Sequence, residues 1–510
     1  MRLGGAGALA VAAGLIAAGS FAAGCQDDCC TIDSFPIVLG RAPSGVPPLD
    51  AGYDGGADAA PLPDGGALLV RAALPAVGPG TFPMVIDTAS PITILGSGLD
   101  APLQTATTDF DLYGSDETPA PLRASFRGWG VLPLPLGPIG DGAIVPGGVL
   151  GGDLLHAFSV ELRLAGPCPD ELPGTCPSLT FWSHLSATQA FLEDAGFAVL
   201  NFTQYGGGEV TADGPPDFLG LRGPLTVPPT RVVLRACAVP TAFSPARDPA
   251  GPPPQACCTS ADALAQSSGV DLSLLVDTGI GPLVLSTTAW NRVVTNAAAR
   301  DPPLLLPPVL ASGTPSGTPL RVASWPTPIQ VLAWAAIPRY ALVNLEAGAN
   351  DDPGPCVELA RARRTEMVSY DTVMNPTAAT HLCVQPCDLD PNQSGEAQNS
   401  AAYLEIGGNV PVAVISDVDP FLQGLQFDVL PEGPQLDGLV GAQALGAARV
   451  ELDYLSSPSR AVFSCEADVP RSSCWAAARC PQLPDQSTVH YCFGLGVHTV
   501  PTNCAPTSCP

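Results

Sequence analysis

Apolar residues occur along this chain in short runs, and the same order of runs appears twice. Residues 85–95 read Val-Ile-Asp-Thr-Ala-Ser-Pro-Ile-Thr-Ile-Leu, and residues 275–285 read Leu-Val-Asp-Thr-Gly-Ile-Gly-Pro-Leu-Val-Leu. Each stretch is an apolar run, an Asp-Thr turn followed by a small residue, and a second apolar run, the pattern of two β-strands joined by a tight turn. The pattern therefore predicts one strand–turn–strand unit in each half of the chain.

A second pair of apolar segments follows the first pair in the same order. Residues 149–164 align without a gap with residues 439–454, so that Gly151 matches Gly441 and the Val-Glu-Leu around Glu161 matches the Val-Glu-Leu around Glu451. Two motifs repeated in one order indicate two copies of one fold. We therefore predict two tandem β-rich lobes.

The repeat and the stretches around it divide the chain into five segments. The stretch before the first copy is rich in Asp, Gly, Ala and Pro and has no apolar period, which is typical of a flexible spacer. The expected segments are a signal peptide (1–24), a lipidated cysteine with a flexible tether (25–66), an N-terminal β-lobe (67–205), a C-terminal β-lobe with insertions (206–464) and a Cys-rich tail (465–510). The N-terminal lobe is expected to end in a helix at residues 187–195 and a strand at residues 198–202.

Composition supports a β-rich protein of more than one folding unit. The 510 residues leave room for two lobes, and 58 Pro and 54 Gly interrupt the chain too often for long helices. The net charge is −27 and no lysine is present, so the chain lacks a basic stripe that could follow a phosphate backbone. We predict an all-β fold and exclude nucleic acid as a partner.

The N-terminus has the pattern of a secretion signal. Arg2 is followed by an apolar and small-residue run at 9–18, too short to remain as a membrane span, and by Phe-Ala-Ala-Gly before Cys25. This ending resembles the lipobox of bacterial lipoproteins, which implies that Cys25 is acylated and anchors the protein to a membrane; plain cleavage is the alternative. Setting Cys25 aside leaves an even number of the 17 cysteines, which suits disulfide pairing in an oxidising compartment. Gln26 lacks the Asp that retains enteric lipoproteins at the inner membrane, so we expect the outer membrane or cell surface.

The two strand–Asp-Thr–strand units resemble the active-site loops of pepsin-like aspartic peptidases, and the later Val149-Leu-Gly and Leu439-Val-Gly segments resemble those that lock the loops. The resemblance covers residues 67–464 and implies two β-lobes related by a pseudo-twofold axis, with a central cleft. It also implies that Asp87 and Asp277 form the catalytic pair.

In such a pair, two carboxylates in contact hold one proton between them, so one acts as base toward a water and the other as acid toward the scissile carbonyl. The resemblance implies that this is a peptide hydrolase, a monomer that acts on peptides or proteins and needs no metal or cofactor. The residues expected to support the pair are Thr88, Ser90, Thr278, Gly279 and, as the tyrosine of the covering hairpin, Tyr113.

Ile280 departs from the family pattern, because a Ser or Thr that bonds the carboxylate usually stands there, whereas Ser90 keeps the hydroxyl in the first lobe. Two alternatives therefore stay open: a catalytically inactive surface lipoprotein of the same fold that binds peptide or another ligand, and a structural envelope protein. An Asp-Thr at a strand end is also compatible with a simple Asx turn. The His381, Cys383 and Cys387 cluster is interpreted as disulfide chemistry in preference to a metal site.

Overall fold

The protein is mostly β, with few helices, as the composition predicts. The computed structural model describes residues 37–42, 46–47, 66–73, 80–95, 107–114, 119–127, 139, 144–167, 175–182, 197–205, 208–210, 225–227, 229–239, 269–300, 303–306, 317–325, 327–344, 354–359, 382–384, 403–429, 435–454, 459–465, 474–479 and 491–493. All of them belong to one unit of the chain, Pro36–Pro510. The predicted signal peptide, Cys25 and the helix expected at 187–195 lie outside the described residues.

Among the described residues the strands form four sheets, of seven, six, ten and two strands. The seven-stranded sheet, which we call the first sheet, has the order β5-β8-β4-β3-β6-β7, with β2 paired to β3. Its strands are β2 (Gly40–Arg41), β3 (Leu68–Ala73), β4 (Thr81–Ile86), β5 (Ile94–Leu95), β6 (Thr107–Tyr113), β7 (Pro119–Arg127) and β8 (Gly148–Leu150). Leu68, Val70 and Ala72 are buried and alternate along β3 with less buried neighbours, the period of two that a strand with one core-facing side requires.

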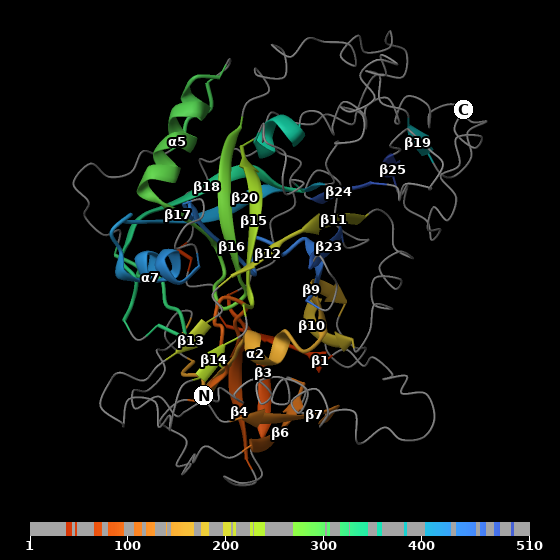
Figure 1. Ribbon diagram of the computed structural model, residues 1–510. Coiled ribbons are helices and arrows are strands. Elements are labelled where there is room, and N and C mark those ends of the chain that lie inside the picture. The colour runs from red at the N-terminus through yellow and green to blue at the C-terminus, as the bar shows by residue number, and fades with distance from the viewer. Residues whose placement is uncertain are drawn as a thin grey trace, which may run out of the picture. The chain divides into compact units, whose positions relative to one another are not determined.

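The ten-stranded sheet, the second sheet, has the order β12-β15-β16-β21-β17-β20-β24-β25-β19, and β18 pairs with β15 and β20. Its strands are β12 (Thr203–Tyr205), β15 (Arg231–Ala238), β16 (Val270–Asp277), β17 (Leu283–Ser286), β18 (Val331–Val343), β19 (Leu382–Val384), β20 (Tyr403–Ile415), β21 (Gly438–Gly441), β24 (Cys474–Arg479) and β25 (Tyr491–Phe493). Figure 1 shows β15, β16, β18 and β20 grouped apart from β3, β4, β6 and β7 of the first sheet.

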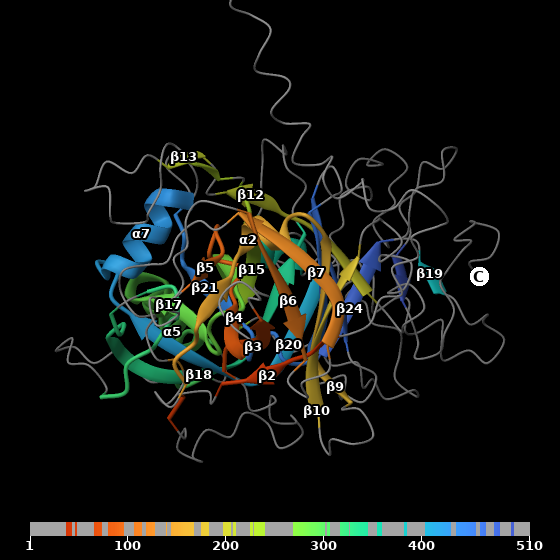
Figure 2. The ribbon, with the colours of Figure 1, turned by 90° about the horizontal axis from the view of Figure 1, so that it is seen from below.

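Helices α5 (Thr287–Ala298) and α7 (Pro420–Val429) accompany the second sheet, and both lie on the side of β17 in Figures 1 and 2. Helix α5 begins where the Ser286 hydroxyl accepts a hydrogen bond from the Ala289 N–H at 3.1 Å. Trp290, Val293 and Ala297 recur at helical spacing and are buried, so α5 presents one apolar face to the core.

The six-stranded sheet, which we call the bridging sheet, contains strands from both copies of the repeat in the order β1-β10-β9-β22-β23-β11. Its strands are β1 (Ile37–Val38), β9 (Ser159–Pro167), β10 (Thr175–Trp182), β11 (Phe197–Asn201), β22 (Ala448–Asp453) and β23 (Arg460–Cys465). The repeated Val-Glu-Leu triplets pair with each other across β9 and β22, with Glu161 directly opposite Glu451. Both glutamates are buried and bonded: Glu161 Oε1 accepts from Arg449 Nε at 2.8 Å, and Glu451 Oε1 accepts from the Ser159 hydroxyl at 2.5 Å.

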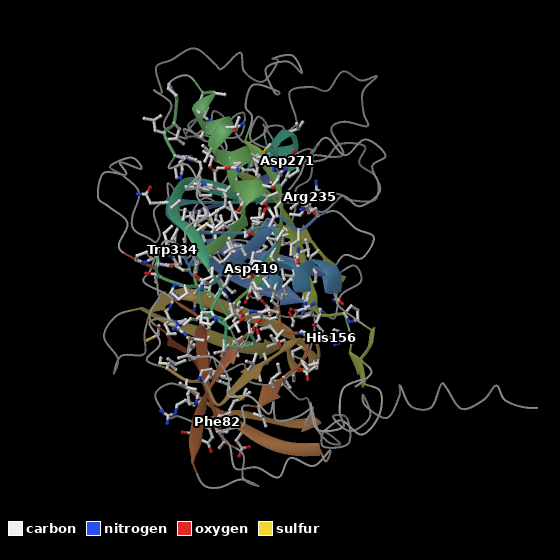
Figure 3. All side chains as sticks on the ribbon, turned by 90° about the vertical axis from the view of Figure 1, so that its left-hand side faces the viewer. Phe82, His156, Arg235, Asp271, Trp334 and Asp419 are labelled. Carbon is white, nitrogen blue, oxygen red and sulfur yellow. A yellow bond between two sulfur atoms is a disulfide. The ribbon has the colours of Figure 1, made fainter. Side chains whose placement is uncertain are left out.

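The remaining short elements are the pair β13 (Gly208–Val210) and β14 (Leu225–Val227), the one-turn helix α2 (Gly152–Leu155) just before His156, and a short helical stretch at residues 355–359. The largest apolar cluster includes Leu68 of the first sheet, Leu234 of the second sheet and Phe463 of the bridging sheet. In Figure 3, Phe82 lies among the strands of the first sheet, while Trp334 and Arg235 lie among those of the second. One continuous core therefore joins the sheets.

The internal repeat predicted from the sequence is present in the strand pairing. In the first copy β8 runs parallel to β4 and antiparallel to β5, and in the second copy β21 runs parallel to β16 and antiparallel to β17. Gly151 and Gly441 follow β8 and end β21, and a Cβ on either would overlap backbone atoms, at Ile92 in the first copy and at Gly281 in the second. Glycine is required at both positions because the two chain segments cross in contact.

Several segment boundaries predicted from the sequence need correction. The expected tether at 25–66 includes β1 and β2, which pair with β10 and β3, and Leu39 between them is buried. At the other boundary β12, assigned to the N-terminal lobe, pairs with β15 of the second sheet. Strands of two or three residues carry too little periodicity to be recognised in a sequence, and their position follows from the sheet that they join.

Disulfides are present among the described residues. Cys237 is bonded to Cys356, 119 residues later, and Cys465 is bonded to Cys474, while Cys176 is disulfide-bonded as well. The second bond joins the expected tail to β23, and β24 of the tail pairs with β20, so this part of the tail is integrated into the second sheet. Disulfides are what an oxidising compartment favours. None of the helices that the structure describes has the length and apolar character needed to cross a lipid bilayer.

Candidate active site

The two repeated strands end at the two Asp-Thr turns. Asp87 follows β4, and its N–H donates to the carbonyl of Leu150 in the first locking segment at 3.1 Å. Asp277 is the last residue of β16 and is paired with Gly441 of the second locking segment. The exposed fractions of Asp87 and Asp277 are 0% and 1%. The locking segments therefore hold both aspartates inside the protein.

Two threonines join the turns by reciprocal hydrogen bonds. The hydroxyl of Thr88 donates to the carbonyl of Val276 at 2.8 Å, and the hydroxyl of Thr278 donates to the carbonyl of Ile86 at 2.8 Å. The N–H of Thr88 donates to Thr278 Oγ1 at 3.3 Å, and the N–H of Thr278 donates to Thr88 Oγ1 at 3.2 Å. Each hydroxyl both donates and accepts, so the two buried side chains are satisfied by one another's turn.

The two carboxyl groups have unequal hydrogen-bond partners. Asp87 Oδ1 accepts from the N–H groups of Ala89 and Ser90, both at 2.9 Å, and Asp87 Oδ2 accepts from the hydroxyl of Ser324 at 2.8 Å. Asp277 Oδ1 accepts from the N–H of Gly279 at 2.9 Å, whereas Asp277 Oδ2 is buried and has no hydrogen-bond partner among the described residues. The charged form of Asp87 is therefore better stabilised than that of Asp277.

Gly279 lies between the two carboxyl groups. A Cβ at this position would stand 3.0 Å from Asp87 Oδ2 and 3.1 Å from Asp277 Oδ1. Both groups therefore border the same point, which only glycine leaves free. The first turn has Ala89 at the equivalent position, and its side chain is buried in an apolar cluster with Ile280.

Both carboxyl groups have raised pKa values. Burial raises the pKa of Asp87 above its usual value, and the hydrogen bonds from Ser324, Ser90 and Ala89 partly offset this increase. Burial raises the pKa of Asp277 well above its usual value, and the charge of Asp87 raises it further. The pair therefore favours the state in which Asp277 holds the proton and Asp87 is ionised.

Arg231 at the start of β15 supplies positive charge to this region. Its side chain is buried, and its Nε donates to the carbonyl of Ala89 at 2.7 Å. The charge of Arg231 lowers the pKa values of both Asp87 and Asp277, which opposes the effect of burial. Because the arginine bonds the backbone of the first turn from the second sheet, it also ties the two copies together.

The structure places some, but not all, of the site residues that the sequence predicts. The structure brings Asp87, Asp277, Thr88, Thr278 and Gly279 together at one junction. Their chemical roles stay predictions. The lipidation site Cys25 lies outside the described residues.

The hydrogen bond made by the Ser90 hydroxyl differs from the one expected from the sequence. It donates to the carbonyl of Ile92 at 2.8 Å instead of to Asp87, and only the backbone N–H of Ser90 reaches the carboxylate. Ile280 is 1% exposed and packs in an apolar cluster with Ala89 and Val284. Neither copy therefore places the hydroxyl expected after its turn on its own carboxylate.

Tyr113 is the last residue of β6, where it pairs with Pro119 of β7 and with Arg71 of β3. Its position beside the connection between β6 and β7 is that of a residue near the end of a hairpin. Its role as the tyrosine of a covering hairpin stays a prediction.

Sequence reasoning missed Ser324, Arg231 and the pair Thr93 and Asp153. The Thr93 hydroxyl donates to Asp153 Oδ1 at 2.6 Å and accepts from the Gly151 N–H at 3.0 Å, which fastens the first locking segment. Asp153 was visible as an acidic residue inside an apolar repeat, where the second copy has Gln443. Ser324 carries no such signal, because it lies 237 residues from Asp87 along the chain.

The described residues contain no group of three or more His, Cys, Asp or Glu side chains that could hold a metal ion. No model of a known protein family matches the chain, and no curated protein matches its sequence. Two buried carboxyl groups that border the same point can act together as an acid and a base when one is protonated and the other is ionised.

Proposed function

We propose that the protein is an extracytoplasmic aspartic endopeptidase with a pepsin-like fold of two pseudo-twofold related β-lobes and a cleft between them. The observation that carries the proposal is the junction of the two repeated Asp-Thr turns. Reciprocal threonine hydrogen bonds join these turns, and their two buried carboxyl groups border the same point at Gly279. A single Asp-Thr turn would carry no such meaning, whereas two equivalent turns held face to face form the minimum apparatus for acid–base hydrolysis.

The unequal partners of the two carboxyl groups assign their roles. Asp87 is the base: ionised and held by the N–H groups of Ala89 and Ser90, it takes a proton from a water molecule as the water oxygen attacks the peptide carbonyl carbon. Asp277 is the acid, and it donates its proton to the carbonyl oxygen as the tetrahedral intermediate forms. Thr88 and Thr278 keep the two groups in register, and Gly279 leaves the space that they border.

The proposal extends to location. The described disulfides agree with an oxidising compartment, and we propose that the protein is exported and anchored to a membrane through an acylated Cys25. Peptides or proteins outside the cytoplasm are then its substrates.

The test is hydrolysis of a mixed peptide library by the full chain, followed by mass spectrometry across a range of pH. We expect Asp87→Asn to reduce the cleavage rate by about 10²-fold or more, the usual contribution of a general base. Asp419→Asn is the matched control: Asp419 Oδ1 accepts from the Phe421 N–H, which an amide oxygen can also do. Equal rates for the wild type and Asp87→Asn would refute the proposal.

The pH profile provides a second measurement. Activity should fall when rising pH ionises both carboxyl groups, and it should also fall when low pH protonates both. Because burial raises the pKa values of both aspartates, the decline on the alkaline side should lie well above the usual pKa of an aspartate. A rate that increases steadily to alkaline pH would exclude the shared-proton mechanism.

One observation favours a second candidate, a catalytically inactive lipoprotein of the same fold that binds peptide. Ile280 presents no hydroxyl, and Asp277 Oδ2 has no hydrogen-bond partner among the described residues. Binding of library peptides without cleavage at any pH would support this candidate over the peptidase.

A further inference from the structure

Residues 320–325, which we call the cover segment, lie over the first Asp-Thr turn although they belong to the second copy. Leu320 pairs with Ile329, and their N–H and carbonyl groups exchange hydrogen bonds of 3.0 and 2.8 Å. Between these partners the chain turns, and the N–H of Trp325 donates to the carbonyl of Val322 at 3.1 Å. The backbone of the cover segment therefore forms a closed turn whose tip contains Ala323 and Ser324.

The tip of the cover segment contacts the first copy at two points. The Ser324 hydroxyl donates to Asp87 Oδ2, as described above, and Ala323 is 1% exposed. Ala323 packs in an apolar cluster whose other members belong to the first copy or to the chain just before it: Ala42, Ala67, Val85, Ile139 and Val149. The cover segment thus inserts one small apolar side chain and one hydroxyl beside the catalytic candidate.

The apolar surface under Ala323 continues directly to Asp87. Val85 precedes Asp87 by two residues in an extended chain, so both side chains lie on the same side of the sheet. Val149 is the partner of Val85 in the β4–β8 ladder and shares that side. Ala323 therefore packs on apolar side chains that lie on the same side of the sheet as the carboxylate of Asp87.

The other side of the cover segment is anchored to the second copy. Leu320, Val322 and Ile329 are buried in an apolar cluster with Phe421 of α7. The Trp325 ring meets the Phe421 ring edge-on, with centroids 5.6 Å apart. The cover segment therefore has a broad apolar attachment on its own side, whereas the contacts described above on the side of Asp87 are one alanine side chain and one hydrogen bond.

We propose that the cover segment is an internal inhibitor that occupies the substrate site beside Asp87 and must withdraw before a peptide binds. This inference rests on the proposed peptidase function. Ala323 stands where a small apolar substrate residue binds, and the Ser324 hydroxyl bonds the carboxylate oxygen that the attacking water needs. Gly317 precedes the cover segment and has a φ of 96°. Glycine adopts this left-handed backbone conformation readily, whereas other residues do so at an energetic cost.

The test measures access to Asp87 without requiring catalysis. A small epoxide esterifies an ionised carboxylate: the carboxylate oxygen opens the ring, and the alkoxide that forms takes a proton from water. Mass spectrometry of the digested full chain then gives the rate of esterification at Asp87. Ala323→Asp places a charge among apolar side chains, and Ala323→Leu is an uncharged variant too large for the same space. Thr327→Ala is the matched control, because Thr327 is exposed just beyond the cover segment.

We expect both Ala323 variants to be esterified at Asp87 about tenfold faster than the wild type or more, the factor that loss of one hydrogen bond to a charged group allows. Thr327→Ala should react like the wild type. Circular dichroism of each variant must match the wild type, and a variant that fails this criterion is replaced by Ser324→Gly. Unchanged esterification in folded variants of Ala323 would overturn the inference.

Activity measurements on the same variants separate this inference from the proposed function. Faster esterification without any peptide cleavage would retain the internal inhibitor as a cover over the carboxylate and reject the peptidase. Peptide cleavage that is equal in the wild type and both variants, with unchanged esterification, would retain the peptidase and reject the inhibitor. Cleavage that increases in parallel with esterification is the expected result.

Discussion

The reciprocal threonine bonds predict a large loss of stability for a substitution that hardly changes shape. Thr88→Val replaces a hydroxyl by a methyl group of similar volume, so no cavity forms. It removes the bond from Thr88 Oγ1 to the Val276 carbonyl and the acceptor of the Thr278 N–H. Both groups are in the buried junction, since the exposed fractions of Thr88 and Thr278 are 0% and 1%.

The magnitude follows from the two groups that lose a partner. A buried donor or acceptor left without its hydrogen bond costs about 1 to 3 kcal/mol, so the loss of two partners should lower the free energy of unfolding by about 2 to 6 kcal/mol. Thr278→Val, which removes the equivalent pair of bonds to Ile86 and Thr88, should cost a similar amount. Thr287→Val is the matched control, because its hydroxyl makes a single, part-buried bond to the Ile415 carbonyl at 3.0 Å.

Urea unfolding followed by tryptophan fluorescence measures these differences, with the midpoint and the slope fitted separately. We expect the Thr287→Val midpoint to correspond to a loss of less than about 1 kcal/mol. If Thr88→Val and Thr278→Val are no less stable than Thr287→Val, the hydroxyls do not join the two turns and the argument for a rigid pair fails.

Two further substitutions test the first and second locking segments. Burial raises the pKa of Asp153 to about 6, so the stability that this group contributes is present below its unfolded pKa and is lost as pH rises through about 6. The free energy of unfolding of Asp153→Asn should therefore increase by about 2 kcal/mol relative to that of the wild type between pH 4 and pH 7. Urea unfolding at both pH values measures this change, and a constant difference would contradict the assignment. Gly441→Ala would overlap the carbonyl oxygen of Gly281 and should cost about 2 kcal/mol or more in the same assay, whereas Gly80→Ala, with no atom within 4 Å, should be neutral to about 0.5 kcal/mol. Equal stability of the two alanine variants would show that the crossing has room for a side chain.

The sequence alone determined the features that depend on local pattern and on repetition. The β class follows from the density of Pro and Gly, and the two strand–turn–strand units follow from apolar runs around Asp87 and Asp277. The gapless alignment of residues 149–164 with 439–454 identified the two glycines at which chain segments cross. The sequence predicts these features because each depends on a few consecutive residues, or on the similarity between two such stretches.

Only the tertiary structure decided what surrounds the two aspartates. Ser324 reaches Asp87 across 237 residues, and the Ser90 hydroxyl turns to a nearby carbonyl although its sequence position suggested the carboxylate. The strands β1 and β2 likewise gain their place from β10 and β3, since a strand of two residues has no period of its own. Contacts between distant segments depend on how whole sheets pack. The spacing of side chains along the chain shows which of them share a face of one element, but it does not show which other element packs against that face.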